Sequence, residues 1–198
     1  SAALLDATLG PTLGDPYAVA PPVRSFKDEV GVDPGRLRIG FSSSKPRGGE
    51  VHLDCVAAVR DVASLCENLG HHVEEASPSF DAELMFQSFT KVMACGVTWM
   101  VEDWERRTGN TPTEGQFEDN IWGLFQAGSK IGASEYLLAV QDIQKGSREV
   151  AEFFERYDLW LTPTLGKPPV LLGSFKYEGD PFELRRRIAD FVPFTWIS

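Results

Sequence analysis

The clearest pattern of apolar and polar positions lies between residues 51 and 70. Apolar residues recur there at spacings of three, four and seven: Val56, Val59, Val62, Ala63, Cys66 and Leu69. This spacing places them on one face of an amphipathic helix, which Gly70 ends. Short strand-like segments flank the helix at residues 36–42 and 71–76. Together they predict a strand, helix, strand unit, which usually forms a parallel strand pair with a right-handed crossover.

Two further helical patterns follow in the middle of the chain. Asp81 is the predicted N-cap of the first helix, which ends near Gly109. Thr113 and Gln116 have the spacing of a capping box, which predicts that a second helix opens there and continues through Phe125. The middle of the chain is therefore expected to be helical.

A third helix leads into a strand that stops abruptly. Ser134 is the predicted cap of a helix over residues 135–157. Residues 159–162 then have the apolar and β-branched character of a buried strand, but Pro163 forbids its continuation as a ladder. Ligands of open α/β sheets bind beyond the carboxyl ends of strands, so residues 162–165 fit a pocket wall. A rigid exit from the sheet without any ligand explains the same residues equally well.

The two ends of the chain each carry a short helical pattern. The first covers residues 2–7 and is followed by a Pro-rich connector at residues 11–34, which is expected to be irregular. The other covers residues 182–191 and starts at Asp180 and Pro181.

Composition and charge exclude several classes of partner. The chain has 198 residues, of which 42% are hydrophobic, enough for one sizeable domain or two small ones. Its net charge of -10 argues against nucleic acid, because no basic excess is available to displace phosphate counterions. The one basic cluster, Arg185 to Arg187, is interpreted as a solvated helix face. No apolar run approaches the roughly 20 residues that span a bilayer, so no membrane partner is expected.

Three cysteines do not form a disulfide framework. Cys55 and Cys66 lie on one helix face, about 16 Å apart at about 1.5 Å per residue, too far for a bond. With Cys95, they are interpreted as small core residues in a reducing cytoplasm. Three histidines offer little support for a metal site, and no cofactor is expected.

Candidate catalytic motifs fail on geometry. Ser42 and Lys45 have the Ser-x-x-Lys spacing, but the prolines and glycines that follow favour a loop over the helix that this chemistry needs. Ser147 follows a glycine inside a long helix, where an exposed face is expected. His71 and His72 are adjacent on a strand and point to opposite faces, so both cannot serve one site. The residues alone show no complete catalytic constellation.

Several separated stretches resemble one family in the same order. They are SAALLDATLGPTLGDPY, GRLRIGFS, VHLDCVAAVRDVASLCENLGHHVEEASP, RYDLWLTPTLGKPP and VPFTWIS. Together they resemble the second half of amidase-signature hydrolases, and GDPY resembles the branch that includes nylon-oligomer cyclic-dimer hydrolases. The resemblance implies an α/β fold with a mixed central sheet flanked by helices, present only as a partial piece.

The resemblance also implies a chemistry that this chain cannot complete alone. The family uses a Ser, cis-Ser, Lys triad to cleave a carboxamide or linear amide, and all three members lie upstream of the part that resembles this chain. The only Gly-Gly pair, at residues 48–49, is followed by Glu50 instead of the family's serine. Residues 1–198 are therefore expected to be the central to C-terminal portion of a single amidase-type domain, without the triad half and the final strands. The isolated chain is expected to be inactive.

The family's helices and strand ends suggest which residues would line the acyl pocket of the parent enzyme. They are Cys95, Trp99, Trp122, Phe125, Thr164, Leu165 and Phe194. Simple core packing is the alternative for each of them. The partner implied for the parent is a small-molecule amide, and a homo-oligomer stays open. The competing class of protein is a non-catalytic α/β binding or interaction module.

Overall fold

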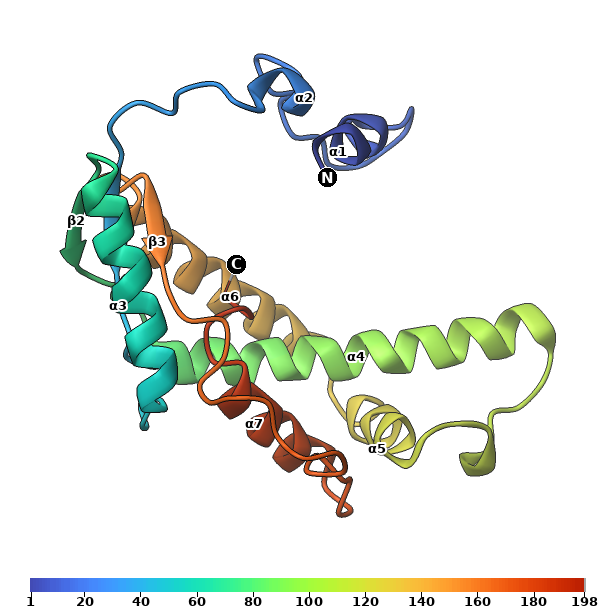
Figure 1. Cartoon of the computed structure of the whole chain (residues 1–198). Coiled ribbons are helices and arrows are strands. Elements are labelled where there is room, and N and C mark those ends of the chain that lie inside the picture. Colours follow the sequence, from blue (N-terminus) through green and yellow to red (C-terminus); the bar gives the residue numbers. More distant parts are fainter. Residues whose placement is uncertain (198) are drawn as a thin grey trace. The chain divides into compact units, whose positions relative to one another are not determined.

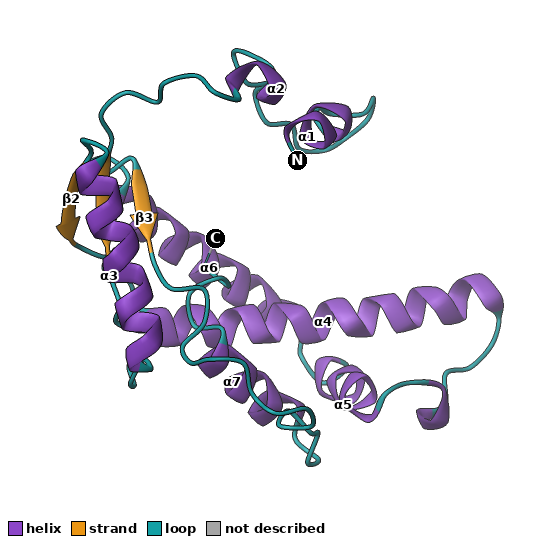
Figure 2. Cartoon of the chain, viewed as in Figure 1, coloured by secondary structure: helices purple, strands orange, loops and turns teal. Residues whose placement is uncertain are grey.

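A parallel sheet of three short strands organises the second part of the chain in the computed structural model, which describes residues 1–197 (Figure 2). The strands are β1 (Arg38–Phe41), β2 (His72–Glu75) and β3 (Leu159–Leu161), in the order β2-β1-β3. Both neighbours run parallel to β1, so the predicted strand, helix, strand unit is confirmed. The α/β class with flanking helices is confirmed, and all three described strands are parallel.

Helices cover the sheet at points that the sequence explains. Helix α3 (Leu53–Asn68) connects β1 to β2, and its apolar face buries Val59 and Ala63. In the middle of β1, a Cβ atom on Gly40 would overlap the ring of Phe153. The missing side chain at this position therefore lets helix α6 (Ala133–Phe153) end directly against the central strand.

A long helix, α4 (Ala82–Thr108), packs against both α6 and α5 (Asp119–Gly128) (Figure 1). Its ends are as predicted: the Asp81 carboxylate accepts a hydrogen bond from Leu84 N, and Gly109 adopts the left-handed conformation. The start of the last helix is also as predicted: α7 (Pro181–Phe191) begins with a proline and is capped by the Asp180 side chain.

Two predicted helix starts are wrong. Thr113 N does donate to Gln116 Oε1, but this contact closes the 3-10 turn η1 (Glu114–Gln116), and α5 begins only at Asp119. Ser134 does not cap α6, whose N-cap is Gly132, because the serine already lies inside the first turn. The helix also ends at Phe153, and a turn separates it from β3. Both errors shift element boundaries without changing the element order.

Residues 1–36 form a compact unit of their own, separate from the unit that starts at Leu37. It contains α1 (Ala2–Thr8) and α2 (Phe26–Glu29), so the connector expected to be irregular carries one short helix. The Asp6 carboxylate accepts hydrogen bonds from the backbone N–H groups of Phe26 and Lys27, at 2.7 and 3.0 Å, which joins the two helices. The assignment of the whole chain to one amidase-type domain stays a prediction.

The length and apolar character of the helices decide whether any of them could span a membrane. None of those described between residues 1 and 197 combines the length and the apolar character that a membrane span requires.

Candidate functional site

The segments that leave β1 and β3 start side by side. Ser42 N donates a hydrogen bond of 3.0 Å to the carbonyl of Leu161, and Trp160 Nε1 donates one of 3.3 Å to Ser42 Oγ. Because the two strands are parallel, these contacts lie at the carboxyl edge of the sheet. In open α/β sheets this edge is where ligands bind.

Gly166 fixes the segment that follows β3. Its N–H donates to the carbonyl of Phe191 at the end of α7, and its own carbonyl accepts from His52 N just before α3. A Cβ atom on Gly166 would crowd both the Asp190 carbonyl and the Lys45 side chain. The Thr-Pro-Thr exit is therefore a tight junction between the sheet and two helices.

Lys45 is buried beside this junction. Its ammonium lies 2.6 Å from Asp190 Oδ1, and the Lys45 side chain is only 6% exposed. The Ser-x-x-Lys motif lies in irregular structure, as the sequence indicated. Lys45 is thus engaged by Asp190 and Ser42 by Trp160, and both residues belong to the same junction.

A pocket of about 590 Å³ opens at this edge of the sheet. Its walls come from the loop after β1, the segment after β3, and α7. The volume falls within the range of small-molecule sites, roughly 300 to 1,000 Å³. Charged side chains dominate the lining, among them Lys45, Arg47, Lys167, Arg186 and Asp190. None of the seven residues expected to line an acyl pocket belongs to this lining.

Glu83, at the start of α4, links two of the pocket's arginines. Its carboxylate lies 2.8 Å from Arg47 Nε and 3.6 Å from a terminal nitrogen of Arg186. Hydrogen bonds from Gln87 and then Arg47 lower the pKa of Glu83. The carboxylate therefore stays ionised well below neutral pH.

A second candidate region is the aromatic cluster between α4 and α5. The Trp122 ring lies 5.9 Å from the Phe117 ring and 5.1 Å from the Phe125 ring, measured between centroids. Thr98 Oγ1 on α4 donates to the carbonyl of Phe125, which ties the two helices together. Trp122 and Phe125 are thus brought together, whereas Trp99 is 66% exposed on α4.

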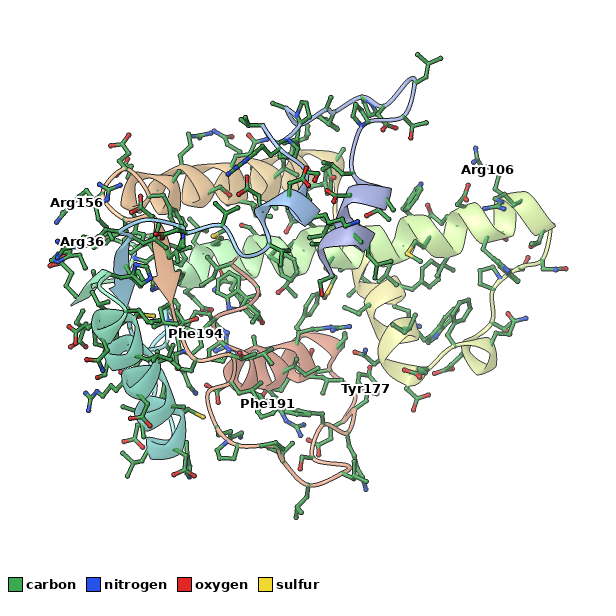
Figure 3. The ribbon with its side chains drawn as sticks, turned by 45° about the horizontal axis from the view of Figure 1, so that its top comes forward. Arg36, Arg106, Arg156, Tyr177, Phe191 and Phe194 are labelled. Carbon is green, nitrogen blue, oxygen red and sulfur yellow. The ribbon has the colours of Figure 1, made fainter. Side chains whose placement is uncertain are left out.

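The remaining predicted residues differ in how far they are exposed to solvent and in which element they belong to. Cys95 is half-buried on α4, and burial, followed by the charge of Glu135, raises the pKa of its thiol, so the thiol stays protonated near neutral pH. Thr164 is exposed and Leu165 half-buried after β3. Phe194 is buried at 4% exposure, near the end of α7 (Figure 3). The role of all seven residues as walls of an acyl pocket stays a prediction.

The structure agrees with the non-catalytic interpretations of Ser147 and of the histidine pair. Ser147 Oγ donates to the carbonyl of Ile143 within α6, as expected for an exposed helix face. His71 Nδ1 accepts from Leu37 N, while His72 is exposed. Within residues 1–197, no group of three potential metal ligands among His, Cys, Asp and Glu lies together.

The interpretation of Arg185 to Arg187 as a solvated helix face holds for Arg186, which is exposed, but not for Arg185 and Arg187, which are half-buried. Arg187 donates to the carbonyl of Ser174 at 2.6 Å, and Arg186 lines the pocket. Arg185 is half-buried, and its Nε has no partner within residues 1–197. The signal that sequence reasoning missed is the position of Lys45 and Arg47, since basic residues directly after a buried strand lie at the sheet edge where ligands bind.

Comparison with known proteins identifies the family. The family model described as Amidase matches residues 1–198. A putative amidase of Synechocystis sp. is 30% identical over 193 residues, which cover 98% of this chain and 35% of the relative. The 6-aminohexanoate-cyclic-dimer hydrolase of Pseudomonas sp. is 24% identical over 207 residues, which cover 98% of this chain and 42% of that protein.

A solved structure supports the same fold. That of a 6-aminohexanoate cyclic dimer hydrolase matches with a TM-score of 0.84 at 23% identity, covering 99% of this chain and 43% of the other. The chain thus spans about two fifths of the length of the relatives it matches. It covers part of an amidase-signature fold, and the resemblance noted in the sequence is confirmed. The chain belongs to the Amidase family.

Proposed function

We propose that this chain forms part of a hydrolase that cleaves a carboxamide or a linear amide. The observation that carries the proposal is the match of the Amidase family model along the whole chain. In the mechanism that the family implies, a lysine acts through a bridging serine as the base, and a second serine attacks the amide carbonyl. Backbone N–H groups stabilise the oxyanion, and water then releases the acyl group.

The contribution of residues 1–198 in this proposal is to hold and line the acyl pocket. Trp122 and Phe125 supply an aromatic wall, since they pack together yet stay partly exposed. Thr164 and Leu165 follow the carboxyl end of β3, where an α/β protein places a ligand. Cys95, Trp99 and Phe194 complete the set, and the triad belongs to another part of the parent protein. The chain alone is then catalytically inactive.

The proposed substrate is a small-molecule amide. Relatives named as 6-aminohexanoate-cyclic-dimer hydrolases support this class, and one solved structure of such an enzyme holds its substrate. We place the parent in the cytoplasm on the basis of the three unpaired cysteines in this chain. Self-association of the parent into a homo-oligomer is a further hypothesis, which sedimentation of the parent would test.

Covalent labelling and an amide assay test the two halves of this proposal separately. The 198-residue chain is treated with a fluorophosphonate probe that marks activated serines, and its intact mass is measured. We expect no adduct, while an active full-length amidase treated in parallel gains one equivalent. Stoichiometric labelling of this chain would contradict its inactivity. The full-length parent is assayed for release of amine from amides, and a parent that leaves them uncut would contradict the assignment to amide hydrolysis.

A non-catalytic binding module is the second candidate function. It is favoured by one observation, the pocket of about 590 Å³ at the sheet edge, which this chain builds from its own residues. Light scattering at several concentrations, combined with thermal melting, separates the two candidates. A stable monomer with one cooperative transition favours the module, whereas association or weak cooperativity favours a part of a larger domain.

A further inference from the structure

Two guanidinium groups share a single carboxylate at the 590 Å³ pocket. Arg47 approaches Glu83 at 2.8 Å and Arg186 approaches it at 3.6 Å. Two unit positive charges therefore meet one negative charge. These three residues together leave an excess of one positive charge on the wall of the pocket.

Arg47 is held in a fixed position with unused donors. Its guanidinium carbon lies 3.8 Å from the centre of the Phe86 ring, and its side chain is 13% exposed. Among residues 1–197, the side chain of Arg47 makes one hydrogen bond, from Nε to the Glu83 carboxylate. The two terminal amino groups of Arg47 donate to none of these residues. A guanidinium presents a planar fork of donors that matches the two oxygens of a carboxylate. Because the fork is already oriented, binding an anion there costs little ordering.

The other charged groups of the pocket do not cancel this excess. Five basic and two acidic side chains line the pocket, in a chain whose net charge is -10. Asp190 neutralises Lys45, and Glu178 lies 3.4 Å from Arg187. Lys167 is exposed and has no ion pair within the described residues, while Glu183 offsets one unit of charge. With Glu83 and Glu178 included, the five basic side chains of the pocket face four carboxylates. One positive charge remains, and it favours the binding of an anion.

Apolar side chains line the same pocket. Val170 and Phe175 come from the segment after β3, and Ala189 and Pro193 from the end of α7 and the residues beyond it. Phe175 packs against Phe191, with ring centroids 5.4 Å apart. A ligand that uses the whole pocket therefore needs an apolar body in addition to its negative charge.

We infer that this pocket binds a small aliphatic carboxylate. The carboxylate group accepts hydrogen bonds from the terminal amino groups of Arg47 and from Arg186, and the aliphatic chain lies against Val170 and Phe175. Lys167 adds attraction from the rim. This binding needs none of the triad residues, so it is independent of the proposed amide hydrolysis.

Calorimetric titration of the 198-residue chain with sodium hexanoate tests this inference, and amide shifts of Gly48 and Gly166 in NMR spectra locate the site. We expect saturable binding with a dissociation constant of about 1 mM, weakened by added salt. R186Q should weaken binding about tenfold, because it removes a charge-assisted hydrogen bond. K167Q, at an exposed position, should weaken it less, and R106Q, near the far end of α4, should leave it unchanged (Figure 3).

Circular dichroism shows whether each variant keeps its fold. Hexanamide tests the need for charge, since it has the same shape without the negative charge, and inorganic phosphate tests the need for the apolar body. Both should bind at least several-fold more weakly than hexanoate. The inference is wrong if hexanoate does not saturate the site, if hexanamide or phosphate binds as tightly, or if R106Q weakens binding as much as R186Q.

Discussion

At the scale of single residues, Asp158 joins the start of β3 to the start of β1. Its carboxylate accepts hydrogen bonds from Arg38 N at 2.7 Å and from the Arg38 guanidinium at 2.8 Å. These side-chain and backbone hydrogen bonds lower the pKa of Asp158 from 3.8 to about 2. A lowered folded-state pKa adds stability that is present above pH 3.8 and is lost as the pH falls towards 2.

We predict that R38Q returns the pKa of Asp158 most of the way towards 3.8. The guanidinium bonds disappear in this variant, while the backbone bond from residue 38 stays. NMR titration of the Asp158 carboxyl carbon between about pH 1.5 and 6 measures the change. R60Q, at an exposed position on α3, serves as the control and should leave the Asp158 titration where it is. A pKa of Asp158 that is the same in R38Q and in the unmodified chain would contradict this account.

At the scale of elements, the contact between α4 and α5 depends on one glycine. A Cβ atom on Gly128 would overlap the backbone carbonyl of Ala94 and the hydroxyl of Thr98. Backbone atoms cannot move aside as the end of a flexible side chain can, so the helices must separate. Gly96 lies on the other helix of this contact, α4. It has open space around its Cα atom and no positive φ.

We predict opposite effects for the same substitution at these two positions. G128A should lower the free energy of unfolding by about 2 kcal/mol, the typical cost of overpacking. G96A should raise it by about 0.5 to 1 kcal/mol, because alanine favours a helix interior. Urea unfolding followed by tryptophan fluorescence measures both, since Trp122 reports on this contact. Equal effects of the two variants would show that close packing at Gly128 does not decide the contact.

The elements themselves could largely be predicted from the sequence, because period and caps are local signals. Asp81, Gly109 and Asp180 mark helix ends that the structure confirms. The start of α5 could not be placed, because the capping-box spacing at Thr113 suits a 3-10 turn as well as a helix. A ligand site at the carboxyl edge of the sheet could be expected from the end of β3, but the charged residues that line the pocket there could not. Lys45 and Asp190 are 145 positions apart, and only the folded chain brings them together.

At the scale of the whole molecule, the family, the fold class and the partial coverage could be inferred from ordered stretches of sequence. The family model matches residues 1–198, which agrees with stretches that are spread in order along the chain. The division into two units was not foreseen, because the Pro-rich connector gives no signal of where contacts end. Arg36 closes the first unit and Leu37 opens the second without any change in composition.

Residues 1–36 contribute nothing to the buried core. No residue between 1 and 36 is buried, whereas the second unit holds the buried core, including Leu124 and Ile39. A chain that starts at Leu37 should therefore keep its fold, with a melting temperature within about 2 °C of the 198-residue chain, because little buried apolar area is lost. Differential scanning calorimetry measures the transition, and NMR amide shifts of α4 and α6 check the fold. A chain cut instead before Leu53 loses β1, the central strand, and should not melt cooperatively. A fall of about 8 °C or more on removal of residues 1–36 would mean that the second unit depends on the first.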